Sequence, residues 1–173
     1  MFINPRSAVD QGWLHYVPEK NIQPNAVDVS LDEIYAIDCT TPFHLTHNSK
    51  IHRKRERVVP FTIEPKELPE FFGWFLPSGI YDFVSNVYVE MPKNTTGWFV
   101  LRSTLNRNGL IVLSGLYDSG YKGPLAGTLH VPGDSYIQVG TPITQFAMAQ
   151  SASEGLYAGG YNVEKGEKAD YLK

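Results

Sequence analysis

The residues best suited to chemistry begin in a polar stretch, RSTLNRNG at residues 102–109, which follows an apolar run. Ser103 and Thr104 can cap a short helical turn here, and the glycine that closes the stretch stands where such a turn ends. The amino end of a helical turn presents unpaired N–H groups that attract anions, and arginine side chains suit phosphate oxygens. Because Arg102 and Arg107 flank the turn, the stretch predicts a phosphate-binding site. The alternative is an ordinary capped loop with surface arginines.

A second polar stretch, YDSGYKG at residues 117–123, stands between two apolar runs and predicts a tight turn. Asp118 is the acid in this apolar neighbourhood. A carboxylate beside a triphosphate could hold and polarise a water molecule for attack on phosphorus. Tyr121 could pack flat on a sugar, which has an apolar face. The alternative is an Asx turn with a tyrosine that serves only packing.

The elements that must position these stretches are short β-strands. From residue 79 onward, apolar runs follow one another and are bounded by Gly, Pro, Asn or Asp, which is typical of an all-β sandwich or barrel. Earlier in the chain, alternation at Val27, Val29 and Leu31 predicts a strand after Pro24. Residues 5–13 predict a short helix, with proline near its start and glycine near its end.

Length and composition narrow the class of protein. The chain has 173 residues, which fits one domain, and 42% of them are hydrophobic, as in globular proteins. A net charge of −3 disfavours general binding of nucleic acid, so a phosphate site would need a local cluster of cations and amides. One cysteine, Cys39, excludes a disulfide framework and a cysteine zinc cluster. No stretch predicts a signal peptide or a membrane span, so we expect the cytoplasm, or a host cytoplasm if the gene is viral.

Two further segments are polar. Residues 46–57 are basic and predict a solvated loop or edge strand, with a nucleic-acid patch as the alternative. The spacing of His44, His47 and His52 matches no metal motif. The C-terminal arm, about residues 155–173, contains tyrosines and lysines among glycines. It could close over a nucleotide and exclude water, and the alternative is a disordered tail.

Four stretches match the motifs of one family. They are IQPNAVDVSLD, GWFVLRSTLNRNGL, GLYDSGYKG and LYAGGYNVEKG, which occur in the family's order and cover most of the chain. The chain therefore resembles the dCTP deaminase and dUTPase superfamily, and within it the dCTP deaminase-like branch. The resemblance implies a mainly β fold, a distorted β-barrel or jelly roll in one domain of residues 1–173. It also implies a homotrimer with active sites between subunits, and Mg²⁺ that travels with the triphosphate.

The resemblance assigns roles to individual side chains. Asp118 would bind the sugar 3′-hydroxyl and position the attacking water, and Tyr121 would lie against the deoxyribose. The base would be read mainly by backbone groups of a hairpin at about residues 111–117, which contains Val112 and Ser114. The remaining residues would be the phosphate-binding Arg102, Ser103, Thr104 and Lys165, the supporting Arg107, and Tyr157 and Tyr161 of the closing arm.

The departures from the family pattern bear on the reaction. Thr128 stands ten residues after the aspartate, where the family's deaminases use a glutamate as proton shuttle. Threonine cannot serve as that acid and base near neutral pH, and the nearest titratable group is His130 on the same strand face. In the arm, Gly160 replaces a phosphate-binding lysine and Glu164 replaces a glutamine; Lys165 or Lys168 could compensate.

We therefore expect a pyrophosphohydrolase that converts a deoxynucleoside triphosphate and water to the monophosphate and pyrophosphate, with dUTP as substrate. Mg²⁺ would neutralise the phosphates while Asp118 orients the water toward the α-phosphorus. One alternative is a dCTP deaminase. Another is a non-catalytic nucleotide-binding or regulatory trimer on the same fold. No nucleic acid or membrane partner is expected.

Overall fold

The computed structural model describes residues 1–66, 69–169 and 172 of the chain. Its helical elements are α1 (Pro5–Asp10), η1 (Glu19–Asn21) and α2 (Ser103–Arg107). Its strands are β1 (Leu14–His15), β2 (Val27–Ile37), β3 (His44–Leu45), β4 (Lys50–Ile51), β5 (Arg55–Arg57), β6 (Phe61–Ile63), β7 (Phe71–Leu76), β8 (Gly79–Glu90), β9 (Thr95–Leu101), β10 (Ile111–Leu113), β11 (Lys122–Val131), β12 (Ser135–Gln138) and β13 (Pro142–Gln150). None of the described helices has the length and apolar character needed to span a bilayer.

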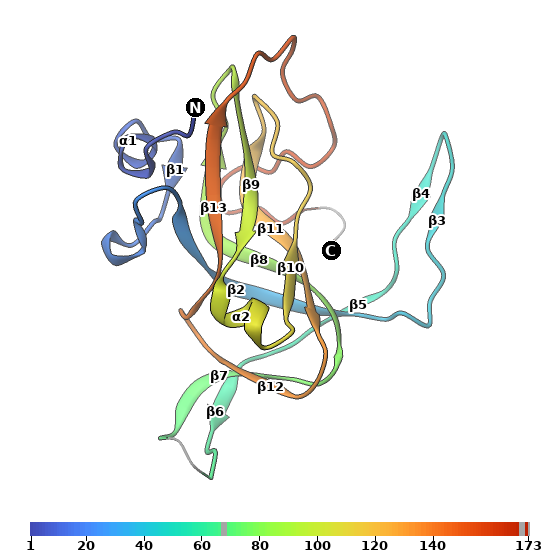
Figure 1. The fold of residues 1–173 in the computed structure, drawn as a ribbon. Helices are drawn as coiled ribbons and strands as arrows, with labels where there is room; N and C mark the ends of the chain where they lie inside the picture. Colours follow the sequence, from blue (N-terminus) through green and yellow to red (C-terminus); the bar gives the residue numbers. More distant parts are fainter. Residues whose placement is uncertain (67–68, 170–171, 173) are drawn as a thin grey trace.

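The main sheet curls into a nearly closed barrel (Figure 1). Its strands follow the order β10-β11-β8-β2-β13-β9, with β1 added to β8 and β5 added to β2. The two ends of this order approach each other where Gly97 of β9 and Tyr117 exchange backbone hydrogen bonds of 3.0 and 2.9 Å. The expectation of a mainly β, distorted barrel is confirmed. The strands predicted from residue 27 and from residue 79 onward lie in this sheet, except β12, which pairs with β7 in a separate three-stranded sheet of order β12-β7-β6.

The barrel interior is filled by two groups of buried side chains. One group centres on Ile34, Phe83 and Leu129, and the other on Val27, Val89 and Phe146. Phe99 of β9 is packed against both groups and so joins them. Because every second residue of a strand faces this core, the residues between them face outward and are available to form a site.

The predicted helix and the predicted basic stretch can also be located in the fold. The helix expected at residues 5–13 is α1, which begins at a proline and is capped by Asn4, whose Oδ1 accepts from Ser7 N at 3.2 Å. The basic stretch at residues 46–57 forms part of the exposed hairpin β3–β4 and the strand β5, which pairs with the end of β2. This hairpin extends away from the barrel in Figure 1. The expectation of a solvated loop or edge strand is confirmed.

Candidate active site

The predicted phosphate turn is the short helix α2, which follows β9 directly. The helix begins at Ser103, so Arg102 takes the capping position and no side chain caps the turn. The expectation that Ser103 or Thr104 would cap the turn is therefore wrong, because both hydroxyls lie within the first turn instead of before it. Both residues are exposed, as is Arg107. Their polar groups therefore lie on the protein surface.

Arg102 is held in place by the barrel. Its Nη1 donates to the Pro142 carbonyl at 2.8 Å, and its Nη2 lies 3.8 Å from Asp28 Oδ2. Asp28 is buried and also accepts hydrogen bonds from Gln145 at 2.9 Å and Gln23 at 3.3 Å. These contacts orient Arg102 beside the helix. They also occupy guanidinium N–H donors that the sequence predicts to bind phosphate.

The second polar stretch forms the predicted tight turn. Tyr121 N donates to the Asp118 carbonyl at 3.1 Å, and Gly120 has a φ of +84°, which a type II turn requires at its third position. Ser119 anchors the turn, because its hydroxyl donates to the Thr95 carbonyl at 2.7 Å and accepts from Thr95 N at 3.0 Å. Asp118 is exposed next to this anchor. The turn thus fixes the backbone of the carboxylate and leaves its side chain accessible.

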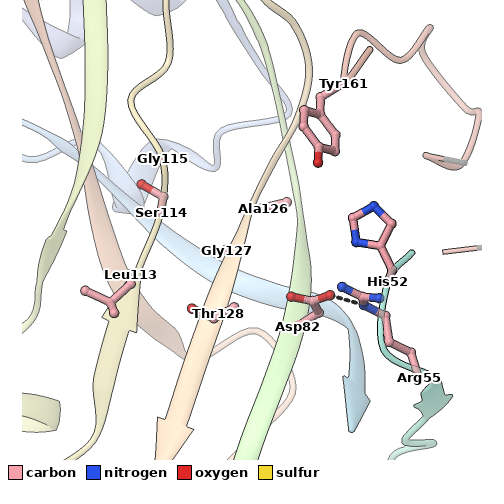
Figure 2. Close-up of a pocket in the computed structure, with 10 residues that line it drawn as sticks. All are labelled: His52, Arg55, Asp82, Leu113, Ser114, Gly115, Ala126, Gly127, Thr128 and Tyr161. Carbon is pink, nitrogen blue, oxygen red and sulfur yellow. Dashed lines mark hydrogen bonds and ion pairs between the residues drawn. The ribbon is translucent and has the colours of Figure 1, made fainter. Parts of the chain in front are cut away.

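Two adjoining cavities lie beside this turn. The one we call the turn cavity has a volume of about 220 Å³ and is lined by Gly115, Leu116, Tyr117, Asp118, Tyr121, Pro124, Ala126, Tyr157, Tyr161, Val163 and Ala169. The one we call the β8 cavity has a volume of about 280 Å³ and is lined by His52, Arg55, Asp82, Leu113, Ser114, Gly115, Ala126, Gly127, Thr128 and Tyr161 (Figure 2). Gly115, Ala126 and Tyr161 line both cavities, so the two adjoin along these residues.

The turn cavity is walled by aromatic rings. Tyr121 and Tyr157 meet edge to face, with ring centroids 5.6 Å apart. The backbone N–H of Tyr157 donates to the Ser119 carbonyl at 2.6 Å, which ties the C-terminal arm to the turn. Tyr161 follows along the arm, and its hydroxyl accepts from Lys50 of the β3–β4 hairpin at 2.9 Å. The structure thus brings both predicted arm tyrosines to the same cavity as Asp118.

The β8 cavity contains Thr128, which the family pattern predicts to stand at the position of the deaminase glutamate. Strand register places Thr128 of β11 between Leu113 of β10 and Asp82 of β8. Directly opposed residues of antiparallel strands project from the same face, so Thr128 and Asp82 are neighbours. Figure 2 shows Asp82 paired with Arg55, whose Nε donates to Asp82 Oδ2. Among the described lining residues of either cavity, His130 is absent.

Asp82, Arg55 and His52 were not predicted as site residues. Asp82 lies in a strand of otherwise mainly apolar and aromatic residues, where aspartate is uncommon, and this is the signal that could have indicated it. Burial lowers the pKa of His52 from its ordinary value of 6.5; Arg55 and Lys50 act in the same direction and Asp82 opposes them. The imidazole is therefore mainly neutral near pH 7.

The predicted base-reading hairpin is only partly exposed to the cavities. Ser114 lines the β8 cavity, and Phe99 N donates to its Oγ at 3.5 Å. The side chain of Val112 is buried in the barrel core, so only its backbone could face a ligand. A Cβ at Gly127 would lie 2.4 Å from the Leu113 carbonyl oxygen, so glycine allows β10 to approach β11 closely here.

Other predicted residues lie apart from these cavities. None of the described residues that line the two cavities belongs to the stretch 102–107. Lys165 instead contacts Glu90 of β8 at 3.0 Å, and Lys168 contacts Glu33 of β2 at 3.0 Å. Within one chain, the turn that carries Asp118 and the helix that carries the predicted phosphate ligands are thus separate.

The site offers few protein ligands to a magnesium ion. Among the described residues, no group of three or more His, Cys, Asp or Glu side chains could hold a metal. Asp118 is the single carboxylate among the described residues that line the turn cavity. Mg²⁺ keeps several water ligands and is commonly bound through one or two carboxylates and substrate phosphates. The donor set fits an ion carried by a triphosphate.

These features define a β-barrel protein with a two-part cavity beside an acidic turn. The model of the dCTP deaminase-like family matches residues 6–151. The chain belongs to this family, and the resemblance inferred from its four motifs is confirmed.

Individual relatives carry two kinds of name. A probable deoxyuridine 5′-triphosphate nucleotidohydrolase of Halobacterium salinarum is 28% identical over 149 residues, which cover 86% of this chain and 87% of that protein. A dCTP deaminase of Sulfurisphaera tokodaii is 26% identical over 170 residues, which cover 91% of this chain and 84% of that protein.

A solved structure supports the fold. The crystal structure of 2′-deoxycytidine 5′-triphosphate deaminase from Agrobacterium tumefaciens matches with a TM-score of 0.62 at 13% identity, covering 85% of this chain. The match spans 46% of the length of that protein. At this identity, the likeness establishes the barrel architecture alone.

Proposed function

We propose that the protein is a dUTPase-type pyrophosphohydrolase, which converts dUTP and water to dUMP and pyrophosphate. The observation that carries this proposal is a pair of adjoining cavities, with Asp118 and Tyr121 lining one and Thr128 lining the other. The first cavity contains the aspartate and the tyrosine to which this proposal gives roles in hydrolysis, and the second has threonine where the family pattern has the glutamate of the deaminases. Relatives named as nucleotidohydrolases support the same reaction. Its substrate is a cytoplasmic metabolite, so we expect the protein to work in the cytoplasm.

In this proposal Asp118 accepts a hydrogen bond from the attacking water and directs its oxygen to the α-phosphorus. The bond from the α-phosphorus to the bridging oxygen then breaks, and its electron pair leaves with pyrophosphate. Tyr121 packs against the deoxyribose, and Tyr157 and Tyr161 exclude bulk water. When bound, Mg²⁺ carried by the triphosphate would neutralise phosphate charge.

We further propose that the site is completed by a second copy of the chain in a homotrimer. Ser103, Thr104 and Arg107 are exposed and lie outside the cavity that contains Asp118. Exposed hydroxyls and an arginine on a short helix suit the phosphates of a nucleotide held by a neighbouring copy. Arg102 would support this helix through its contacts with Asp28 and Pro142.

One observation favours the second candidate, a dCTP deaminase. Asp82 places a carboxylate beside Thr128, in the cavity where the family's deaminases have glutamate. The relative named dCTP deaminase, 26% identical over 170 residues, supports this alternative. The arm departs from the family pattern at Gly160 and Glu164, which keeps a non-catalytic nucleotide-binding trimer as a third outcome of the same experiment.

The deciding experiment supplies dUTP and dCTP separately with Mg²⁺ and measures pyrophosphate and ammonia. Pyrophosphate from dUTP without ammonia is the expected result. Ammonia from dCTP would overturn the proposed hydrolase in favour of the deaminase. Neither product, with measurable nucleotide binding, would identify a regulatory protein.

The variant Asp118→Asn tests the proposed catalytic role. We expect hydrolysis of dUTP to fall by about 10²-fold or more, because an amide orients water poorly and cannot accept its proton. The matched control is Asp134→Asn, an exposed aspartate between β11 and β12 that lines neither cavity. Both variants should show the thermal melting curve of the parent protein. Retention of activity by Asp118→Asn would disprove the water-positioning role.

A further inference from the structure

The β8 cavity contains charged side chains that have no role in the proposed hydrolysis. Asp82 and Arg55 form an ion pair there, with side chains only 14% and 15% exposed. Partial burial of two charges is unfavourable because they lose hydration, and their mutual attraction offsets only part of this loss. Neither group takes part in the proposed attack on phosphorus, whose machinery lies around Asp118. We therefore expect the ion pair to have a function within the β8 cavity, such as the binding of part of the substrate.

The shape of a pyrimidine nucleotide indicates what would reach this cavity. In the proposed site the sugar lies at Asp118 and Tyr121, so the base extends through the shared residues Gly115 and Ala126 into the β8 cavity. The sugar is bonded to N1 of the ring, and C4 is the ring atom opposite N1. The exocyclic group on C4 therefore points away from the sugar and toward Asp82.

The chemistry of the β8 cavity distinguishes the two common groups at C4. Uracil has a carbonyl oxygen there, which accepts hydrogen bonds, and cytosine has an amino group, which donates them. An ionised carboxylate only accepts, so Asp82 matches the amino group of cytosine. The hydroxyl of Thr128 can donate or accept, so it can serve the uracil carbonyl. The cavity thus offers a suitable partner for either base.

Arg55 holds the Asp82 carboxylate in one orientation. Its Nε donates to Asp82 Oδ2, and its Nη1 donates to the Arg53 carbonyl at 2.9 Å, so the guanidinium is anchored to the backbone. Among the described residues, none donates a hydrogen bond to the other carboxylate oxygen of Asp82. That oxygen is available to accept from a ligand in the cavity (Figure 2).

We propose that Asp82, oriented by Arg55, binds the 4-amino group of cytosine, so that the enzyme hydrolyses dCTP as well as dUTP. The proposal rests on the proposed pyrophosphohydrolase function and extends its substrate class. The reaction is dCTP plus water to dCMP plus pyrophosphate. The water oxygen bonds to the α-phosphorus, the bond to the bridging oxygen breaks toward pyrophosphate, and the water proton passes by way of Asp118 to solvent. The amino group stays on the ring, and no ammonia forms.

Binding measured without turnover separates this proposal from the catalytic one. Calorimetric titration with the α,β-imido analogues of dCTP and dUTP, in the presence of Mg²⁺, gives the two dissociation constants. We expect the dCTP analogue to bind no more than about tenfold more weakly than the dUTP analogue. A larger difference in favour of the dUTP analogue overturns the proposal while leaving dUTP hydrolysis standing. If neither analogue binds, the proposed function fails together with this extension.

Variants of Asp82 test the contact itself. Asp82→Ala should weaken the dCTP analogue by about tenfold or more relative to the dUTP analogue, because a hydrogen bond to a charged group is lost. Asp82→Asn keeps the shape of the side chain and supplies a donor to the uracil carbonyl, so it should also weaken the dCTP analogue relative to the dUTP analogue. This variant keeps the test decisive if the alanine variant unfolds. Glu56→Gln is the matched control, since Glu56 is an exposed acid on β5 that lines neither cavity. An equal loss for both analogues would refute a specific role of Asp82.

Product analysis completes the test. Incubation of the parent protein with dCTP and Mg²⁺ should release pyrophosphate and dCMP. Ammonia as the product from dCTP would refute the proposed hydrolysis and would make Asp82 a candidate for the acid–base group of a deaminase. No product from dCTP, in a preparation that hydrolyses dUTP, would also refute it.

Discussion

At the scale of single residues, Gly127 sets the spacing of the strands that form the floor of the cavity. A Cβ at this position would meet the Leu113 carbonyl at 2.4 Å and a ring carbon of Phe99 at 3.1 Å. The first obstacle is backbone, which cannot move aside as a flexible side chain can. The absence of a side chain at Gly127 therefore allows β10 to lie close to β11. As a result, Thr128 and Ser114 line the same cavity.

The variant Gly127→Ala measures this constraint. Overpacking a tight site costs roughly 1–3 kcal/mol, so we expect the free energy of unfolding to fall by that amount in urea denaturation. Nucleotide binding should weaken as well, because β10 must move. Gly133→Ala is the control: a Cβ there would meet no atom within 4 Å, so its effect should be within about 0.5 kcal/mol. Equal stability of the two variants would show that β10 is not held tightly.

Single residues also show how far sequence reasoning reaches. Asp118 and Tyr121 could be located because they lie within one short motif whose turn chemistry is local, and Thr128 could be located because the family pattern has its acid ten residues after the aspartate. Asp82 and Arg55 could not, because their proximity to Thr128 depends on the pairing of β8 with β11 and on the position of β5 beyond the end of β2. Strand register between distant segments is set by the whole core and leaves no short signature.

At the scale of elements, the C-terminal arm follows the surface of its own barrel. Val163 N donates to the Lys122 carbonyl at 2.9 Å, and the Tyr88 hydroxyl donates to the Val163 carbonyl at 2.9 Å. Val163 and Ala169 are buried by this docking. The arm lacks the periodicity of a helix or strand. Its tyrosines could therefore be predicted from the sequence, but the course of its backbone along the barrel could not. Docking along β8 and β11 is what brings Tyr157 and Tyr161 over the cavity.

Glu90 makes this docking sensitive to acid. Lys165, Lys122 and His15 face its carboxylate at 3.0, 3.3 and 3.2 Å. The hydrogen bond from Lys165 is the main cause that lowers the pKa of Glu90 below its ordinary value of 4.5, against partial burial and with help from Lys122. A carboxylate with a lowered pKa stabilises the docked state above its ordinary pKa. That contribution disappears as the pH falls through the lowered value.

We therefore expect the arm to stay docked between about pH 5 and 8 and to loosen below about pH 4.5. The measurement is the amide resonance of Val163, followed by nuclear magnetic resonance as the pH is lowered. In Glu90→Gln, the arm should be more loosely docked at pH 7, and the acid-dependent change should be smaller. An identical pH profile in parent and variant would disprove the role of Glu90.

At the scale of the whole molecule, the barrel separates the two halves of the proposed chemistry. The cavity that contains Asp118 also contains the arm of the same chain, whereas α2 lies outside it. In the function proposed above, one chain would hold the nucleoside and a partner copy would bind the phosphates. Sequence motifs predict both halves and give no measure of the distance between them. That distance depends on how the nearly closed barrel is built.

Mixed assembly of two inactive variants tests this division. Asp118→Asn and Arg107→Ala should each hydrolyse dUTP poorly, for different reasons. Refolding them together should restore part of the activity, because some sites combine an intact Asp118 from one chain with an intact Arg107 from another. The control mixes Asp118→Asn with the double variant Asp118→Asn and Arg107→Ala, which leaves every site without its aspartate. Absence of recovery in the first mixture would contradict a site shared between copies.

The opposition of Thr128 and Asp82 across β11 and β8 has a consequence for the descent of this family. Two positions that share one face of a sheet can exchange an acidic residue through two point mutations while the backbone stays the same. Relatives can then keep an acid in the same cavity although no aligned position is acidic in all of them. A search for the acidic group of this cavity in relatives should therefore compare all residues that share this face of the sheet.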